Sequence, residues 1–142
     1  MPSVNLTFFN QFLEDLAEKK HNLGSDTLKI MLTNTAPSAT NQVKADITEI
    51  SAGNGYTAGG ATVSVISSAH EAGVYKLKAN PVSWTATGPV AAFRHAVLYN
   101  DSAPSDELIG WWDYGAEVEL SDTEEFSIAP GTDNVLIQLA AA

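Results

Sequence analysis

The chain has 142 residues, no cysteine and a formal net charge of −10. A chain of this length can bury roughly 68–70% of its unfolded surface in one domain, so it needs neither a disulfide nor a metal to fold. The lack of cysteine excludes thiolate catalysis and zinc–thiolate sites, and the excess of carboxylates disfavours binding to nucleic acid or to an anionic membrane.

An amphipathic helix is predicted at the start of the chain, over roughly residues 8–21, because apolar residues there recur at helical spacing. The apolar positions that share one helical face are Phe9, Phe12, Leu13, Leu16 and Ala17. Thr7 is a suitable N-cap, while Lys19, Lys20 and His21 fall where cations complement the helix dipole.

From about residue 27 the apolar period changes to two, which indicates β-strands. The predicted strands cover residues 28–32, 61–66, 73–79, 82–86, 91–100, 108–120, 125–129 and 135–140. Short strands separated by turn residues are typical of a sandwich or barrel. We therefore predict a mainly β protein in which residues 1–142 form a single domain. Its core would be an antiparallel β-sandwich, Ig-like or jelly-roll-like, over about 27–140.

The segment 108–120 alternates most clearly between apolar and polar residues. Trp111 and Trp112 are adjacent, so on a strand they point to opposite faces. If Trp112 belongs to the core, Trp111 lies on the outer face beside Asp113, where a large aromatic can mark a contact surface. Helix packing over that face would instead bury Trp111, and both alternatives stay open.

The segment 51–60 (SAGNGYTAGG) holds four glycines, and its Asn54-Gly55 pair favours a tight turn. Phosphate-cradling loops need a strand before them, a helix N-terminus after them and usually a Lys, which this context does not supply. We expect a flexible interaction loop with Tyr56 as its only large side chain. The candidate interaction surface accordingly comprises Asn54, Tyr56, Trp111 and Asp113.

The three histidines carry no recognisable catalytic motif. His21 is placed at the helix end, His70 in a turn over residues 67–73, and His95 on a strand as a packed or interface residue. A nucleophile–His–carboxylate triad assembles in space and is not testable from spacing, but no nucleophile elbow supports one. We therefore expect neither a catalytic residue nor a cofactor-binding site, and we expect that the protein is not an enzyme.

Carboxylates are the remaining side chains that could take part in acid–base catalysis or metal binding. Glu117 and Glu119 share the polar face of their strand with Asp113, where solvation is the default. A divalent cation among Asp101, Asp106 and Glu107 is conceivable, but the spaced pattern of a calcium loop is missing. We therefore expect no metal site.

No targeting segment is visible. The first residues lack the basic region and continuous apolar core of a secretory signal. No apolar run approaches the ~20 residues that span a bilayer. We expect synthesis in a cytoplasm.

Several motifs in order carry a resemblance over nearly the whole chain: LGSD, TLKIMLTNTAP, ADITEIS…GYTAGG, AAFRHAVLYND, LIGWWDYG and ELSDTEEFSI. This pattern resembles a family of small virion structural proteins encoded by tailed bacteriophages. The resemblance implies a location in the virion and contacts with other virion proteins, the major capsid protein foremost. It also implies repeated copies or a homo-oligomer, and it transfers no functional residue.

Within a virion, the resemblance is compatible with a head decoration protein or with a tail component. The acidic chain has no coiled-coil heptads, repeats or basic arm, which favours the outside of the head shell. A tail-tube subunit normally has long hairpins, and none is obvious in the sequence. The first hypothesis is thus a non-enzymatic capsid decoration protein. The alternatives are a tail or adsorption component (fibre or tail tip) and a carbohydrate-binding β-sandwich module with Trp111 and Tyr56 as stacking platforms.

Overall fold

The computed structural model describes residues 6–140. Within this range the chain is mainly β, with antiparallel sheets and one α-helix near the N-terminus, which confirms the predicted fold class. A five-stranded sheet has the order β1-β8-β7-β2-β3. Its strands are β1 (Thr7–Phe8), β2 (Leu28–Thr33), β3 (Ala61–Thr62), β7 (Phe93–Asn100) and β8 (Leu108–Val118).

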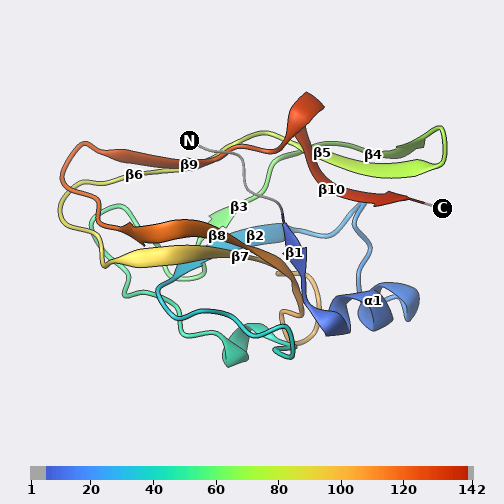
Figure 1. Ribbon diagram of the computed structural model, residues 1–142, viewed down its shortest axis with the longest axis horizontal. Coiled ribbons are helices and arrows are strands. Elements are labelled where there is room, and N and C mark those ends of the chain that lie inside the picture. The colour runs from blue at the N-terminus through green and yellow to red at the C-terminus, as the bar shows by residue number, and fades with distance from the viewer. Residues whose placement is uncertain (1–5, 141–142) are drawn as a thin grey trace.

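A second layer lies over one face of this sheet (Figure 1). It consists of a three-stranded sheet in the order β10-β5-β4 and a separate two-stranded sheet, β6-β9. The strands are β4 (Val65–Glu71), β5 (Val74–Ala79), β6 (Val82–Thr85), β9 (Glu125–Ile128) and β10 (Val135–Ala140). Two 3-10 turns complete the regular structure, η1 (Lys44–Asp46) and η2 (Thr132–Asn134).

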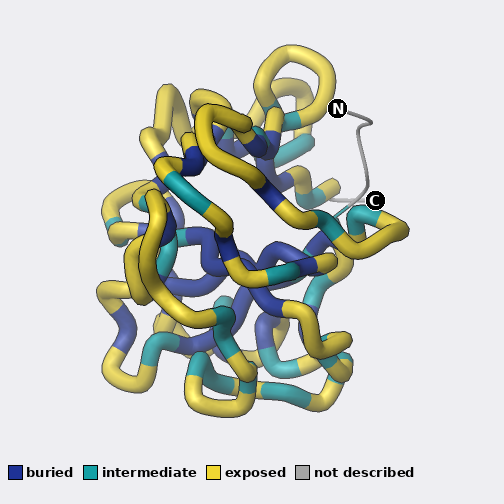
Figure 2. Tube along the Cα trace, turned by 90° about the vertical axis from the view of Figure 1, so that its left-hand side faces the viewer, coloured by how far each residue is buried: buried dark blue, intermediate teal, exposed yellow. Residues whose placement is uncertain are grey.

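The main hydrophobic core fills the space between the two layers. Alternate residues of β2 point into it because side chains on a strand change face at every step. The five-stranded sheet contributes Ile30 of β2 and Trp112 of β8, which are both buried in this core. The second layer contributes Trp84, Phe126 and Ile137. Figure 2 shows the result, with buried segments inside and exposed loops around them.

A second, smaller apolar cluster covers the opposite, outer face of the five-stranded sheet. Its buried members are Phe9, Met31, Val97, Tyr99 and Leu108. The long connection between β2 and β3 closes over them, since Ile47 packs against the cluster and the Tyr99 hydroxyl donates a hydrogen bond to the Gly59 carbonyl. Both faces of β2 and β7 are therefore covered.

The helix α1 (Asn10–Ala17) is shorter than predicted. Thr7 and Phe8 pair with Trp111 and Gly110 of β8, so the chain is still extended where the helix was expected to begin. The helix ends before Lys19, whose positive φ of 69° interrupts the helical backbone. The prediction of a helix over residues 8–21, with Thr7 as its N-cap and cations in its last turn, is therefore wrong at both ends.

The predicted apolar face of the helix is only partly correct. Phe12 is fully buried and stacks on Phe8, with ring centroids 4.9 Å apart. Leu13 is 62% exposed. Phe9 is buried, but it precedes the helix and belongs to the outer cluster. The helix thus contributes one main anchor, Phe12, to the core.

Replacing Phe12 by Ala should lower the free energy of unfolding by ~3–5 kcal/mol, as large core truncations do. The adjacent Leu13→Ala is a matched control, because an exposed side chain away from special features contributes within about 0.5 kcal/mol. Chemical denaturation of both variants measures the difference. Equal losses would contradict the assignment of Phe12 as the anchor.

Most strands after residue 27 agree with prediction, with two exceptions. The predicted strand 61–66 is divided between β3 (Ala61–Thr62) and β4 (Val65–Glu71), which belong to different sheets. Residues 67–73 were expected to form a turn with His70 in it, but Ser67–Glu71 belong to β4 and the turn is limited to Ala72 and Gly73. The short β1 was also not predicted. Between residues 6 and 140, no helix is long and apolar enough to cross a membrane.

Candidate interaction surface

Trp111 lies on the outer face of β8, opposite in direction to the buried Trp112. Phe9 packs against it, with ring centroids 4.6 Å apart and a 45° angle between the ring planes. Trp111 is half-buried as a result. Trp111 thus lies on the outer face, as one of the two alternatives had it, but Phe9, which precedes α1, covers part of its ring.

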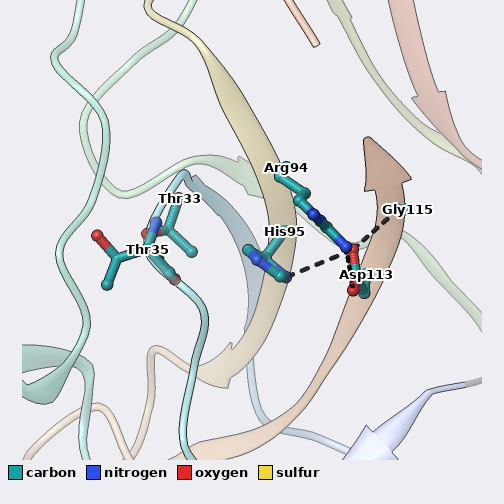
Figure 3. A network of polar contacts seen from close by, with 6 residues as sticks. All are labelled: Thr33, Thr35, Arg94, His95, Asp113 and Gly115. Carbon is teal, nitrogen blue, oxygen red and sulfur yellow. Dashed lines mark hydrogen bonds and ion pairs between the residues drawn. The ribbon is translucent and has the colours of Figure 1, made fainter. Parts of the chain in front are cut away.

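Asp113 is exposed on the same face of β8 and forms an ion pair with Arg94 of β7 (Figure 3). The guanidinium donates two hydrogen bonds, Nε to Oδ1 at 2.9 Å and Nη2 to Oδ2 at 3.2 Å. The backbone N–H of Gly115 donates a third, at 2.8 Å. These donors lower the pKa of Asp113 to about 2, with the Arg94 hydrogen bond as the largest cause.

His95 lies between this ion pair and β2, and its ring points toward Asp113 (Figure 3). The Nδ1 atom is 3.8 Å from Asp113 Oδ1 and has no hydrogen-bond partner. Burial lowers the pKa of His95, while the charge of Asp113 acts in the opposite direction. Thr33 lies opposite His95 on the neighbouring strand β2, and its hydroxyl donates a hydrogen bond to the Thr48 carbonyl.

Tyr56 is not an exposed contact residue, and the prediction that it is one is wrong. The side chain is only 2% exposed and belongs to the main core, near Trp84. Its hydroxyl accepts a hydrogen bond from the Leu32 backbone N–H at 3.1 Å and donates one to Glu49. Burial and the hydrogen bond to Glu49 raise the pKa of Tyr56. Replacing it would damage the core rather than a free surface.

Asn54 is exposed, and its side-chain amide donates a hydrogen bond to the Pro89 carbonyl at 2.6 Å. It has a positive φ of 54° and forms the predicted tight turn with Gly55, closed by paired hydrogen bonds between Gly53 and Tyr56. The four candidate residues are thus not one surface. Tyr56 anchors the loop in the core, and Trp111 and Asp113 lie on the outer face of β8.

Two of the four glycines of residues 51–60, Gly55 and Gly60, serve close packing, a role that the prediction of a flexible loop did not include. A Cβ at Gly60 would collide with the Ile30 carbonyl oxygen, and one at Gly55 would collide with the Thr85 carbonyl oxygen. Both positions also have positive φ, 83° and 102° respectively. The loop can approach β2 and β6 this closely only because these residues have no side chain.

We expect Gly60→Ala to destabilise the protein far more than Gly73→Ala. Both glycines have nearly the same φ, 83° and 82°, but a Cβ at Gly73 would meet nothing within 4 Å. Gly73→Ala should therefore lose only the roughly 1–2 kcal/mol of left-handed backbone strain, whereas Gly60→Ala adds a clash with backbone. Denaturant titration of the two variants measures this, and similar midpoints would contradict the close approach.

A buried polar cluster near α1 was not predicted. His21 is buried away from the helix end, and its Nδ1 lies 3.0 Å from Asn100 Nδ2, which also donates to Asp26 at 2.7 Å. Asp15 Oδ2 and His21 Nε2 are buried without a hydrogen-bond partner. The assignment of His21 to the helix dipole is wrong. No periodicity marks such a cluster, because its members come from distant parts of the chain.

Burial is the largest cause that lowers the pKa of His21, and nearby carboxylates oppose it. Burial acts in the same way on His95. In the unfolded chain both imidazoles regain a pKa near 6.5 and bind protons at higher pH than in the fold. At mildly acidic pH the unfolded state therefore binds more protons than the folded state. The free energy of unfolding consequently decreases as the pH falls.

We expect the free energy of unfolding to decrease as the pH drops from about 7 to about 5. His21→Gln and His95→Gln should each flatten this dependence, whatever their effect on stability at neutral pH. His70→Gln is the control, since His70 is exposed on β4. Denaturation curves across the pH range measure the slopes. An unchanged slope in both variants would contradict the role of the buried imidazoles.

The carboxylates considered for a cation lie in different surroundings. Asp101 is 3.8 Å from Lys29 Nζ, and Glu107 is buried and accepts hydrogen bonds from the Ser105 backbone N–H. Across residues 6–140, no group of three or more His, Asp or Glu side chains is placed to hold a metal ion.

The most exposed regular element is β4. All seven of its residues are exposed, and it forms one strand of the hairpin β4–β5 at one end of the long axis (Figure 1). Val65 and Ile66, exposed by 38% and 51%, lie on this strand. The sequence did not predict its full length, because residues 67–73 were expected to form a turn.

Comparison with protein-family models, curated proteins and solved structures finds no match for this chain.

Proposed function

We propose that this chain is a non-enzymatic structural protein of a bacteriophage virion that decorates and stabilises the capsid by binding the major capsid protein. The observation that carries the proposal is the exposed hairpin β4–β5. Its outer strand has every residue exposed and includes two large apolar side chains. An exposed apolar strand of this kind suits contact with another protein.

The charge distribution supports a place on the outside of a shell. A group of exposed carboxylates surrounds the turn between β8 and β9, at the end of the molecule opposite the hairpin (Figure 1). They are Glu117, Glu119, Asp122, Glu124 and Glu125. An acidic end of this kind is more stable in water than against a second acidic surface. A decoration protein whose hairpin faces its neighbours would leave this end in contact with water.

A tail or adsorption component is the second candidate, and the hairpin favours it too. The apparent lack of a long hairpin was the argument against a tail-tube role. In the structure, however, β4 and β5 form a hairpin whose pairing runs from Val65 opposite Ala79 to Glu71 opposite Val74. This hairpin removes the argument. The third hypothesis, a carbohydrate-binding module, loses its two stacking platforms, because Tyr56 is buried and Phe9 packs against Trp111.

Quantitative mass spectrometry of purified phage particles that encode this chain tests the proposal. Hundreds of copies per particle are expected for a decoration of the head, because a shell repeats its major subunit many times. A few to some dozens of copies would assign the chain to the tail and overturn the decoration role. Absence from washed particles, with the capsid and tail proteins detected as internal controls, would overturn the virion assignment itself.

A further inference from the structure

We propose that the free edge of β4 pairs with β4 of a second copy of this chain, antiparallel and about a two-fold axis. The proposal rests on the proposed function in that virion proteins occur in many neighbouring copies. It goes further by naming the strand, the partner and the register. The joined sheet would have the order β10-β5-β4-β4-β5-β10.

The edge of β4 is open for such pairing. Among residues 6–140, β4 pairs with β5 on one side and with no strand on the other. Backbone N–H and C=O groups of alternate residues on an edge strand point away from its neighbour and are free to bond another strand. The exposure of all seven residues shows that no described loop covers this edge.

Most of the strand, Ser67–Glu71, also lacks the features that usually protect an edge. Natural edge strands are kept short, or carry Lys, Pro or a bulge. The edge strands β1 and β3 of the larger sheet have two residues each, whereas β4 has seven and contains neither Lys nor Pro. Its register with β5 is irregular only between Val65 and Ser67. The remaining five residues, Ser67–Glu71, form a regular and unprotected edge.

Charge favours a second copy as the partner. A chain with a net charge of −10 repels itself over most of its surface, but β4 contains a single carboxylate, Glu71. Lys76 and Lys78 lie 2.8 and 3.5 Å from that carboxylate and offset its charge. Pairing through β4 also keeps the acidic ends of the two copies apart, because they lie at the far end of each molecule (Figure 1).

The regular segment sets the register. A two-fold axis at Ala69, its middle residue, places Ser67 opposite Glu71 and Ser68 opposite His70, so that no like charges face each other. The two Glu71 residues would be four positions apart, on the order of 14 Å. That distance exceeds the ~10 Å Debye length at 0.1 M salt. Val65 and Ile66 would then lie beside the partner's turn at Ala72 and Gly73.

The expected contact is weak in free solution. Stable interfaces bury about 1,200–2,000 Å² in total, more than a single strand pair provides. A particle surface that holds copies close together raises their effective concentration, and the same contact then becomes significant. The pair should therefore be concentration-dependent in solution and persistent on particles.

Thiol crosslinking of the full chain tests the proposal, since the wild-type chain has no cysteine to interfere. Ala69→Cys places a thiol at the two-fold axis, and a short bis-maleimide at millimolar protein should convert it to a covalent dimer. Ala116→Cys is the matched control, an exposed alanine on β8. Yields that are equal in the two variants, or absent from both, would overturn the proposal.

A charge variant gives an independent measurement. Ala69→Lys puts two like charges opposite each other at the axis and should abolish the concentration-dependent rise in mass seen by sedimentation equilibrium. Ala116→Lys has the same net charge and should keep that rise. A wild-type chain that stays monomeric at millimolar concentration overturns the pairing even if the protein is abundant on particles. A dimer in solution that is missing from particles would leave the pairing intact and overturn only the virion role.

Discussion

The central strands β2 and β7 carry apolar side chains on both faces, and most of the structure follows from the need to cover both. Ile30 and Leu98 face the second layer, while Met31 and Val97 face the opposite way. A strand with two apolar faces is stable only if protein packs on each of them. The second layer covers one face. On the other, Phe9 and the connection between β2 and β3 close over the sheet.

This requirement explains why residues 51–60 are structural. The connection must pass close to β2 to bury Tyr99 and the Tyr56 hydroxyl, and Gly60 permits that approach. Glycine content alone does not distinguish a mobile loop from one whose backbone lies against a strand, because both need residues without side chains. The sequence predicted the turn at Asn54 and Gly55 from its chemistry, but it could not reveal the partner that β2 provides.

Apolar patterning and the turn residues between segments predicted the fold class and most strand positions. Periodicity failed for β4, whose residues are exposed on both faces and therefore have no repeat to detect. It failed for β1 because Thr7 and Phe8 have apolar neighbours at helical spacing, and their pairing with β8 overrides that local preference. The cluster around His21 and Asn100 joins segments 79 residues apart and leaves no local pattern.

The same reasoning separates the two kinds of surface on this protein. Where the outer face of the large sheet is apolar, the chain covers it with its own residues, as Phe9 does for Trp111. Where charges are dense, as around Glu117–Glu125, the surface is left to solvent. The edge of β4 is not covered by another described strand and carries a single carboxylate, Glu71, which is paired with lysines of β5. Pairing with another strand would satisfy the free backbone groups of this edge and cover the exposed Val65 and Ile66. The surface most suited to assembly is therefore one that no apolar–polar repeat in the sequence marks.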